Sequence, residues 1–559
     1  MAGGVKKPVN IFRLKNTGEP EGAFNWRLWF AVVSFGLLGA ARGIDEGLIT
    51  GAFNSHDFQE AINYDSFSTV EQANIKANVS AMVQIGSVGG ALIAFTICDR
   101  IGRIWATRVL TTIWAVGIAI FMITGVKGNL GGIYAGRFIA GLGVGMTPVV
   151  GPIYLAEVAP ASVRGVCTCF FTGAVYIGIV LAYFANYGAH LHISSESHKQ
   201  WLVPTSLHII FAGIAFILSF FQYESPRFLV KQGKIDKAAE SLGKLRKQDP
   251  SGDYVRNCIQ EIVNAHEMEK EATRGVGWAG KLKEMFLNKS NLYRLWLASM
   301  VQFLSQWSGA GSITLYAQDL FALIGVAGES EGLLVTAVFG IVKLIAAISC
   351  ALFLVDVIGR KRSLLIGITL QCVSMIYVAS FLTAAPKLGV DDSWVLSESL
   401  KPASRGAIAM IYISGMGWAL GWNTMQYLLT AELFPLRIRA LATSWSMTLH
   451  FANQYGNSRA VPNMLLPVSA GGISPKGTFW CFAAVTFVGG LWVWLFVPET
   501  SGRTLESMDR LFDLPWYRIG LYGNKDADAQ DEVIDEKQRQ AEEEHGRAEQ
   551  CEKRGAVDV

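Results

Sequence analysis

The feature that most constrains this chain is a series of long apolar stretches. A helix needs roughly 20 mostly apolar residues to cross the hydrocarbon core of a bilayer, which is about 30 Å thick. Charged residues make up 17% of the chain, below the roughly 25% of a soluble domain, and they gather in 231–290 and 505–559. The sequence therefore predicts an all-α membrane protein and excludes a soluble enzyme with several globular domains. Twelve stretches meet the length requirement, with these approximate bounds: 28–50, 76–97, 107–126, 131–151, 166–188, 201–222, 292–324, 331–355, 363–384, 405–430, 441–469 and 476–497.

Several other classes of protein find no support in the sequence. The net charge of +3 is too small to indicate a nucleic-acid partner. The eight cysteines form no CxxC pair and no metal-ligand spacing, so neither a disulfide framework nor a metal site is expected. Gly141-Leu-Gly-Val-Gly145 lies within an apolar stretch, where small residues allow close helix packing, and is no dinucleotide motif. We therefore expect neither catalytic residues nor a cofactor.

Basic residues indicate which connections face the cytoplasm, because cytoplasmic loops carry an excess of Lys and Arg. The segment 231–290 holds 12 of them, whereas 51–75, on the other side, holds none. Both termini and the central segment are therefore expected in the cytoplasm, and the first 25 residues do not read as a cleaved signal peptide. The expected organisation is a cytoplasmic N-terminal segment 1–27, a six-helix bundle 28–222, a cytoplasmic linker with short helices 223–290, a second six-helix bundle 291–498 and a charged cytoplasmic tail 499–559.

The second half of the chain repeats short motifs of the first half. Asp99-Arg-Ile-Gly-Arg103 follows the second stretch, and Asp356-Val-Ile-Gly-Arg360 follows the eighth. Duplicated six-helix halves are typical of transporters that expose a central site alternately to the two sides of the membrane. Three pairs of residues share one offset of 275 positions: Glu157 and Glu432, Arg164 and Arg439, and Glu224 and Glu499.

These repeated charged residues are candidates for a cytoplasmic gate. Carboxylates and guanidinium groups at helix ends form charge-assisted hydrogen bonds, which would hold the inner ends of the two halves together until the halves rock apart. The alternative is that the arginines only fix the topology. The candidate gating residues are Asp99, Arg100, Arg103, Glu157, Arg164, Glu224, Arg227, Asp356, Arg360, Glu432, Arg439 and Glu499.

Specific motifs recur along residues 28–510. They are Gly136-Arg137, Pro152-Ile-Tyr-Leu-Ala-Glu157, Glu224-Ser-Pro-Arg227, Gln302 with Gln306-Trp-Ser-Gly309, Asp356-Val-Ile-Gly-Arg360 and Pro498-Glu499-Thr. With these motifs the chain resembles the sugar porter family of the major facilitator superfamily. The resemblance implies a major facilitator fold, with twelve transmembrane helices in two pseudo-symmetric six-helix bundles and a cytoplasmic helical segment between them. It also implies a plasma-membrane protein that works as a monomer, with a sugar or sugar acid, protons and the lipid bilayer as its partners.

Proton-coupled members of the family carry an Asp in the first helix, and the matching residue here is Asp45. The family's partner for that Asp is matched by Arg137. A carboxylate inside a membrane helix is costly and usually functional, so we expect Asp45 to carry the coupling proton and Arg137 to modulate it. The alternative is a permanent ion pair that holds two helices together without any use of protons.

The cargo site departs from the family pattern at several positions. Arg42 and Lys343 stand where the family has an aromatic residue and an Asn, and Thr172 replaces a Gln. Arg and Lys only donate and bring charge, whereas amides both donate and accept, so this site loses amides and gains cations. The predicted substrate-binding residues are Arg42, Thr172, Gln302, Gln306, Lys343, Trp422, Asn423 and Gln426.

Buried cations need anions, and two sources are open. The substrate supplies the anion if it is a uronate, an aldonate or a quinate-like ring acid. The protein supplies it if Arg42 pairs with Asp45 or Glu46, which lie at helical spacing on the same stretch. We favour an acid slightly, because Lys343, a lone Lys inside its stretch, has no obvious carboxylate on its own helix. His450 and Arg459 stay unassigned, and a non-transporting nutrient sensor remains the alternative from another class.

Overall fold

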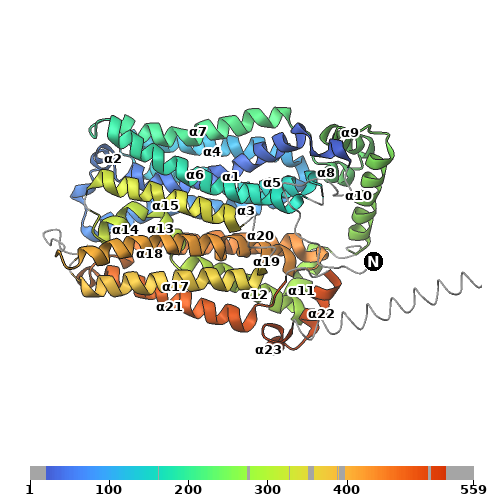
Figure 1. Cartoon of the computed structure of the whole chain (residues 1–559). Coiled ribbons are helices and arrows are strands. Elements are labelled where there is room, and N and C mark those ends of the chain that lie inside the picture. Colours follow the sequence, from blue (N-terminus) through green and yellow to red (C-terminus); the bar gives the residue numbers. More distant parts are fainter. Residues whose placement is uncertain are drawn as a thin grey trace, which may run out of the picture.

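The computed structural model describes residues 20–160, 163–272, 277–326, 328–350, 358–386, 388, 397–500 and 505–523. Every regular element in these ranges is a helix, as the apolar stretches predicted. The helices form two layers of long rods (Figure 1).

The first layer consists of the long helices of the N-terminal half. α1 packs against α6 and α7, while α5 lies between α3 and α4. Glycines allow these close approaches: a Cβ at Gly86 would lie 2.2 Å from the Phe138 carbonyl oxygen on α5. The bounds are α1 Trp26–Phe53, α2 His56–Ala61, α3 Thr69–Ile101, α4 Arg103–Val126, α5 Leu130–Val158, α6 Arg164–His192 and α7 Lys199–Leu218, with single 3-10 turns at Glu21–Phe24, Tyr64–Ser66 and Ser219–Phe221.

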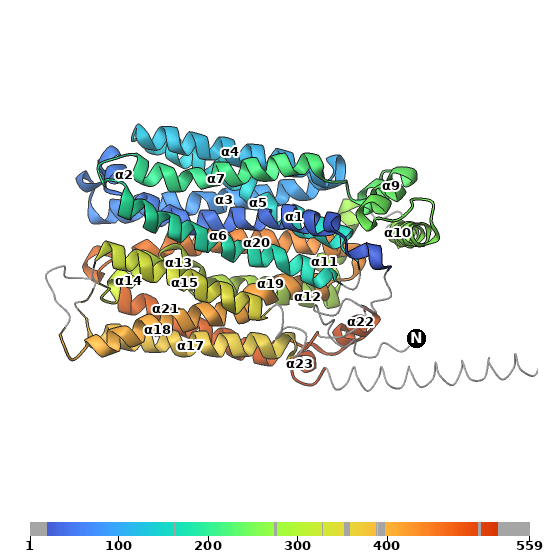
Figure 2. The same ribbon diagram turned by 45° about the horizontal axis from the view of Figure 1, so that its top comes forward.

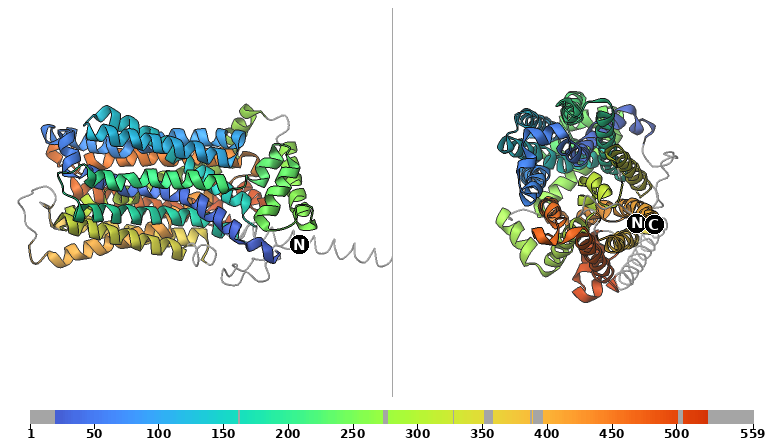
Figure 3. Two further views of the ribbon diagram at one scale, coloured as in Figure 1. Left: turned by 90° about the horizontal axis from the view of Figure 1, so that it is seen from above. Right: turned by 90° about the vertical axis from the view of Figure 1, so that its left-hand side faces the viewer.

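The second layer is built by the C-terminal half. It meets the first layer where α3 packs along α20 and α6 along α15, and the view down the helix axes shows the two groups facing each other (Figure 3). Its bounds are α12 Lys289–Trp307, α13 Ala310–Leu315, α14 Ala317–Leu323, α15 Glu329–Ser349, α17 Arg360–Ala384, α18 Lys401–Leu420, α19 Trp422–Leu433, α20 Leu436–Met464 and α21 Ser474–Phe496, with a 3-10 turn at Val468–Ala470.

Short helices lie at one end of the two layers, which we call the linker end (Figure 2). There, α8–α10 share a small apolar core that includes Val230, Leu242 and Val255. The other end carries α2 and α14, and we call it the opposite end. The helices at the linker end are α8 Pro226–Lys231, α9 Ile235–Arg246, α10 Asp253–Ala272, α11 Trp278–Leu287, α22 Leu505–Asp513 and α23 Trp516–Ile519.

Within the described ranges, nine helices are long and apolar enough to cross a membrane by length and composition. Each of the twelve predicted stretches overlaps one or more helices. The seventh and tenth stretches, expected as single helices, are broken. Gly309, with a φ of 86°, separates α12 from α13, and Gly421 separates α18 from α19. A positive φ is open to glycine at little cost, and uniform apolarity along the chain gave no sign of the break.

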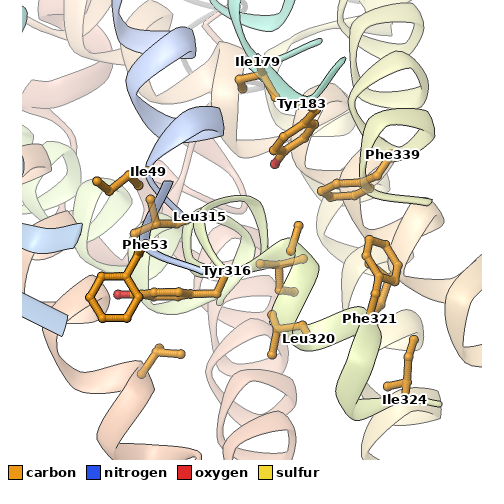
Figure 4. Packing of buried hydrophobic residues seen from close by; sticks show 14 of the residues in the cluster. Ile49, Phe53, Ile179, Tyr183, Leu315, Tyr316, Leu320, Phe321, Ile324 and Phe339 are labelled. Carbon is orange, nitrogen blue, oxygen red and sulfur yellow. The ribbon is translucent and has the colours of Figure 1, made fainter. Parts of the chain in front are cut away.

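A large apolar cluster joins the two halves at the opposite end. Ile49 and Phe53 of α1 lie beside Leu315 and Tyr316 of the C-terminal half (Figure 4). Tyr183 of α6 belongs to the same cluster, and its hydroxyl donates to the Thr314 carbonyl oxygen at 2.6 Å. The cluster closes this end of the interface between the halves.

Candidate functional site

Buried amides gather near the break between α12 and α13. Gln302 and Gln306 on α12 and Gln426 on α19 are all buried. Nε2 of Gln302 donates to the Gln426 carbonyl oxygen at 3.4 Å, and the Ser305 hydroxyl donates to Oε1 of Gln426 at 3.1 Å. Asn457 on α20 donates to the Gln306 carbonyl oxygen at 2.6 Å. Buried polar groups are costly unless they are bonded, so this cluster of amides marks a polar site inside the bundle.

His450 connects this amide cluster to the N-terminal half. Its Nε2 lies 2.9 Å from Nη2 of Arg42. A guanidinium only donates, so this Nε2 accepts and Nδ1 carries the proton. Nδ1 donates a hydrogen bond to Oε1 of Gln302 at 3.1 Å and lies 3.2 Å from Nε2 of Gln306. His450 is therefore a neutral link between α1 and the amides, a role that the sequence left unassigned.

Arg42 is paired within the protein. Its Nε lies 3.0 Å from Oε1 of Glu46, one helical turn away. Its Nη2 donates to Oε1 of Gln454 at 3.4 Å, and Nε2 of Gln454 donates to Glu46 at 3.0 Å. Of the two anion sources considered for Arg42, the structure therefore contains the internal one, Glu46. Glu46 and Gln454 were not among the predicted site residues, although an acidic residue inside an apolar stretch was a signal.

Lys343 on α15 differs from Arg42 in its partners. It is 2% exposed, and its Nζ donates to the Thr314 hydroxyl at 2.5 Å. Its ammonium lies 5.4 Å from the ring centre of Tyr176 and 5.3 Å from that of Phe339. No ion pair of the described residues includes Lys343, and Glu46 is the carboxylate that attracts it electrostatically. The result is a buried cation held by a hydroxyl and two aromatic faces.

The remaining predicted substrate-binding residues are Trp422 and Asn423 on α19 and Thr172 on α6. Trp422 is fully buried in the apolar core of the C-terminal half, and a Cβ at Gly489 of α21 would lie 3.3 Å from its ring. Nε1 of Trp422 and Nδ2 of Asn423 have no hydrogen-bond partner among the described residues. Thr172 is half-buried on α6. Orphaned buried donors of this kind are places where a polar ligand or water gains a bond.

Asp45 and Arg137 form the ion pair that the sequence suggested. Nη1 and Nη2 of Arg137 lie 2.5 Å and 3.3 Å from the two carboxylate oxygens, and the side chains are 2% and 1% exposed. Nε of Arg137 donates to the Val79 carbonyl oxygen at 3.1 Å. The pair therefore ties α1, α3 and α5 together. A second ionisable group, His208 of α7, lies with Nε2 3.6 Å from Oδ1 of Asp45.

The charged residues at the linker end join helices of the same half. Nη2 of Arg103 lies 2.8 Å from Glu157 and 3.5 Å from Asp99, which connects α4 to α5 and α3. Asp99 also pairs with Lys231 of α8 at 2.7 Å. Among the described residues, these pairs lie within the N-terminal half, whereas the expected latch joins the two halves.

Glu224 and Glu499 bind backbone groups. Glu224 accepts from the N–H groups of Arg103 and Ile104 at 3.0 Å and 3.3 Å. Glu499 accepts from those of Arg360 and Lys361 at 2.7 Å and 3.1 Å. Each carboxylate thus caps the N-terminus of a membrane helix. Burial raises the pKa of the Glu224 carboxyl, although these backbone donors oppose the shift.

The remaining predicted gating residues lie as follows. Arg100 and Arg227 are exposed, and Arg439 donates to the Phe434 carbonyl oxygen at 3.0 Å. Asp356 lies outside the described residues, as do the side chains of Arg164 and Glu432.

The opposite end holds polar contacts between the halves that the sequence did not reveal. Asp319 of α14 lies 2.8 Å from Nζ of Lys76 on α3 and accepts from Nδ2 of Asn54 at 2.9 Å. Arg459, unassigned from the sequence, donates to Oδ1 of Asn74 at 2.8 Å. These bonds reinforce the apolar closure of the same end.

Comparison with known proteins assigns the chain to a family. The family described as sugar (and other) transporter matches residues 30–512. The chain belongs to this family of transporters. It is accordingly an integral membrane transporter and not an enzyme, with sugar-like small molecules as the substrate class of its family.

Curated relatives of this transporter include fungal proteins. A protein named "Probable quinate permease" from Aspergillus niger is 31% identical over 493 residues, which are 88% of this chain and 89% of the relative. The "Quinate permease" of Emericella nidulans is 30% identical over 496 residues, 88% of this chain and 90% of the relative.

Solved structures show the fold. The major facilitator superfamily proton:xylose symporter XylE, bound to 6-bromo-6-deoxy-D-glucose, matches with a TM-score of 0.70 and 22% identity, covering 87% of this chain and 99% of XylE. An inward-open structure of XylE from E. coli matches with a TM-score of 0.67 and 21% identity, covering 87% and 99%. The transporter therefore has the major facilitator fold that the sequence motifs implied.

Proposed function

We propose that this transporter carries out proton-coupled symport of a polyhydroxylated ring acid, of which quinate is the model. The observation that carries the proposal is Lys343. A buried ammonium without a paired carboxylate is costly, and a substrate carboxylate would remove that cost. The buried amides of Gln302, Gln306 and Gln426 suit the rest of such a molecule, because amides both donate and accept, as hydroxyls do.

The relatives support the same substrate class. Two of them, at 30% and 31% identity, are named for the transport of quinate, which is a cyclohexane ring that bears hydroxyls and one carboxylate. The distribution of cations also agrees with one carboxylate. Arg42 is already neutralised by Glu46 at 3.0 Å, which leaves Lys343 for the substrate.

Proton coupling is supported by the pair of Asp45 and Arg137. A buried carboxylate against a guanidinium loses its proton easily, and separation of the two would favour protonation. If rocking of the halves changes this distance, proton occupancy follows the side to which the site is open. An inward proton gradient would then drive uphill uptake.

We further propose the orientation and the division of the chain. The linker end, with the basic residues of 231–290, faces the cytoplasm at the plasma membrane. Segments 28–222 and 291–498 act as the two moving bundles. Because the contacts between halves at Asp319, Thr314 and Leu315 lie at the opposite end, this structure corresponds to a state closed toward the outside.

The test is uptake by purified protein in liposomes, with and without an inward proton gradient. The labelled panel holds quinate, galacturonate, gluconate, glucose and xylose. The proposal expects gradient-driven accumulation of quinate or another acid above the neutral sugars. Accumulation of glucose or xylose with the acids ignored would overturn the acid specificity and leave symport intact. Binding without accumulation of any compound would instead indicate a sensor.

A neutral hexose or pentose is the second candidate. It is favoured by the internal pairing of Arg42 and by the amides of Gln302 and Gln306, which suit a neutral sugar equally well. The same panel decides between the two candidates.

A further inference from the structure

His208 is a buried histidine whose tautomer is fixed by its own helix. It lies on α7 and is 2% exposed. Its Nδ1 lies 3.0 Å from the carbonyl oxygen of Thr205, three residues earlier. A carbonyl oxygen only accepts, so Nδ1 must carry a proton and donate it. The other ring nitrogen, Nε2, is therefore a lone pair in the neutral ring and an N–H in the imidazolium.

This Nε2 faces the carboxylate of Asp45. It lies 3.6 Å from Oδ1 and has no hydrogen-bond partner among the described residues. With a neutral ring, a lone pair would face a carboxylate oxygen, and both side chains are buried. Two acceptors at such a distance gain nothing from one another, whereas a proton on either one converts the contact into a hydrogen bond. The geometry is that of a site for one additional proton.

Among the described residues, few charged or titratable side chains lie near Asp45 and His208. On α5, Arg137 contacts both oxygens of Asp45, and the electrostatic interactions found for Asp45 are with Arg137 and His208. From α4, the side chain that faces His208 is the Trp114 ring, at 5.9 Å between ring centres and close to perpendicular. The histidines of α6, His190 and His192, lie at the end of that helix, far along the chain from its middle.

We propose that His208 and Asp45 hold the coupling proton jointly, with the proton on Nε2 of His208 and the hydrogen bond directed to Oδ1 of Asp45. Loading adds one proton to the Nε2 lone pair, and no other bond forms or breaks. Release returns the proton to water and leaves a neutral ring beside an Asp45–Arg137 ion pair. This inference rests on the proposed symport and adds α7 to its proton-binding element.

The test compares His208→Gln, which keeps a polar side chain without a titrating ring, with wild type. Exchange of labelled quinate across liposomes at equal pH reports translocation, and gradient-driven accumulation of quinate reports coupling; glucose serves as a second probe. We expect the variant to retain exchange within about threefold while accumulation falls by about tenfold or more. The pH dependence of exchange should also change in the variant, because glutamine has no titrating ring. His192→Gln, at an exposed position of α6, is the matched control and should behave as wild type.

The outcomes separate this inference from the proposed function. If wild type exchanges either probe but accumulates neither, proton symport itself is wrong. If wild type accumulates and His208→Gln accumulates equally, with an unchanged pH profile, symport stands and the role of His208 is overturned. Should His208→Gln fail to fold, nitrogen NMR of histidine-labelled wild type and Asp45→Asn replaces it. A histidine Nε2 signal that shows gain of a proton as the pH is lowered, and that Asp45→Asn displaces, supports the proposal; the absence of any such signal contradicts it.

Discussion

Glu224 and Glu499, 275 positions apart, cap two membrane helices in the same way. Each carboxylate accepts from the first two backbone N–H groups of its helix, α4 for Glu224 and α17 for Glu499. These groups have no partner within a helix, and the helix dipole favours negative charge at this end. The repeat in the sequence therefore corresponds to the same pair of hydrogen bonds in each half. These bonds connect the segment that follows the last membrane helix of each half to the N-terminus of the third membrane helix of that half.

Two glycines make these caps possible, which gives a first prediction. Gly102 and Gly359 have φ values of 91° and 96°, and an added Cβ would lie 2.4 Å and 2.6 Å from the oxygens of Glu224 and Glu499. Gly102→Ala and Gly359→Ala should each lower the free energy of unfolding by about 1–3 kcal/mol. Thermal unfolding in detergent, followed by tryptophan fluorescence, measures this change.

Gly233→Ala and Gly213→Ala are the controls for the glycine variants. Gly233 has a positive φ of 74° and Gly213 does not, and neither Cβ would meet an atom within 4 Å. Gly233→Ala should lower the free energy of unfolding only by the strain of a positive φ, and Gly213→Ala should leave it unchanged. Equal melting temperatures for all four variants would show that the contact with the carboxylates has no energetic role.

A second prediction concerns pH and Glu224. Burial raises the pKa of this carboxyl, so the folded state binds its proton more tightly than the unfolded state does. The corresponding stability is present below the ordinary carboxyl pKa of about 4.3 and is lost as the pH rises through the folded pKa. Glu224→Gln lacks this titration, so its deficit in melting temperature relative to wild type should shrink from acid to neutral pH. Glu240→Gln, at an exposed position of α9, should show no such trend; a constant deficit for Glu224→Gln would contradict the prediction.

A third prediction addresses substrate charge. Lys343→Asn replaces a buried cation with a neutral amide, so the relative uptake of acid over neutral sugar should fall by roughly tenfold or more, as expected for loss of a charged hydrogen bond. The measurement is competition between labelled quinate and glucose in liposomes. Lys199→Asn, at the exposed start of α7, is the control. An unchanged preference in Lys343→Asn would exclude Lys343 as the carboxylate ligand.

A fourth prediction concerns the proton. Asp45→Asn should abolish gradient-driven accumulation while exchange at equal pH survives, because the amide cannot be ionised. Arg137→Gln should instead destabilise the fold by about 3–5 kcal/mol, since it leaves a buried carboxylate unpaired. Uptake assays and thermal unfolding separate the two effects. Intact accumulation in Asp45→Asn would mean that the pair is structural only.

A fifth prediction concerns the closed end. Asp319→Ala removes the contacts to Lys76 and Asn54, which should favour opening by about 1 kcal/mol, or about fivefold in population. Opening is measured as the rate at which an impermeant maleimide labels Leu315→Cys, since Leu315 is buried in the closed end. Glu60→Ala, at an exposed position of α2, should leave the labelling rate unchanged. Equal rates with and without Asp319 would show that this contact does not hold the end closed.

Some of the site followed directly from the sequence. The pair of Asp45 and Arg137 was predicted because charged residues inside apolar stretches are rare and because the family pattern links these positions. The internal partner of Arg42 was foreseen as one of two alternatives, since Glu46 lies one helical turn away. The amides of Gln302, Gln306 and Gln426 were expected in one site, and the structure brings them together.

Other parts depended on contacts between distant segments. The bond from Arg42 to His450 joins positions 408 apart, and no local pattern indicates it. The sequence indicates no role for His208, because a single histidine in an apolar helix is informative only when its contacts on the neighbouring helix are known. The break at Gly309 was hidden for a related reason, because glycine occurs throughout these helices and only packing shows which one adopts a positive φ.

The sequence by itself determined that the chain spans a membrane with helices, that it consists of two related halves, and which charged residues are exceptional. These properties follow from the length of apolar runs and from the cost of burying charge, both of which are local. Only the tertiary structure decided that Glu46 neutralises Arg42, that Lys343 has a hydroxyl and two rings as neighbours, and that His208 faces Asp45. The partner of a buried polar group is chosen by which helices pack together, and that choice is made by the whole bundle.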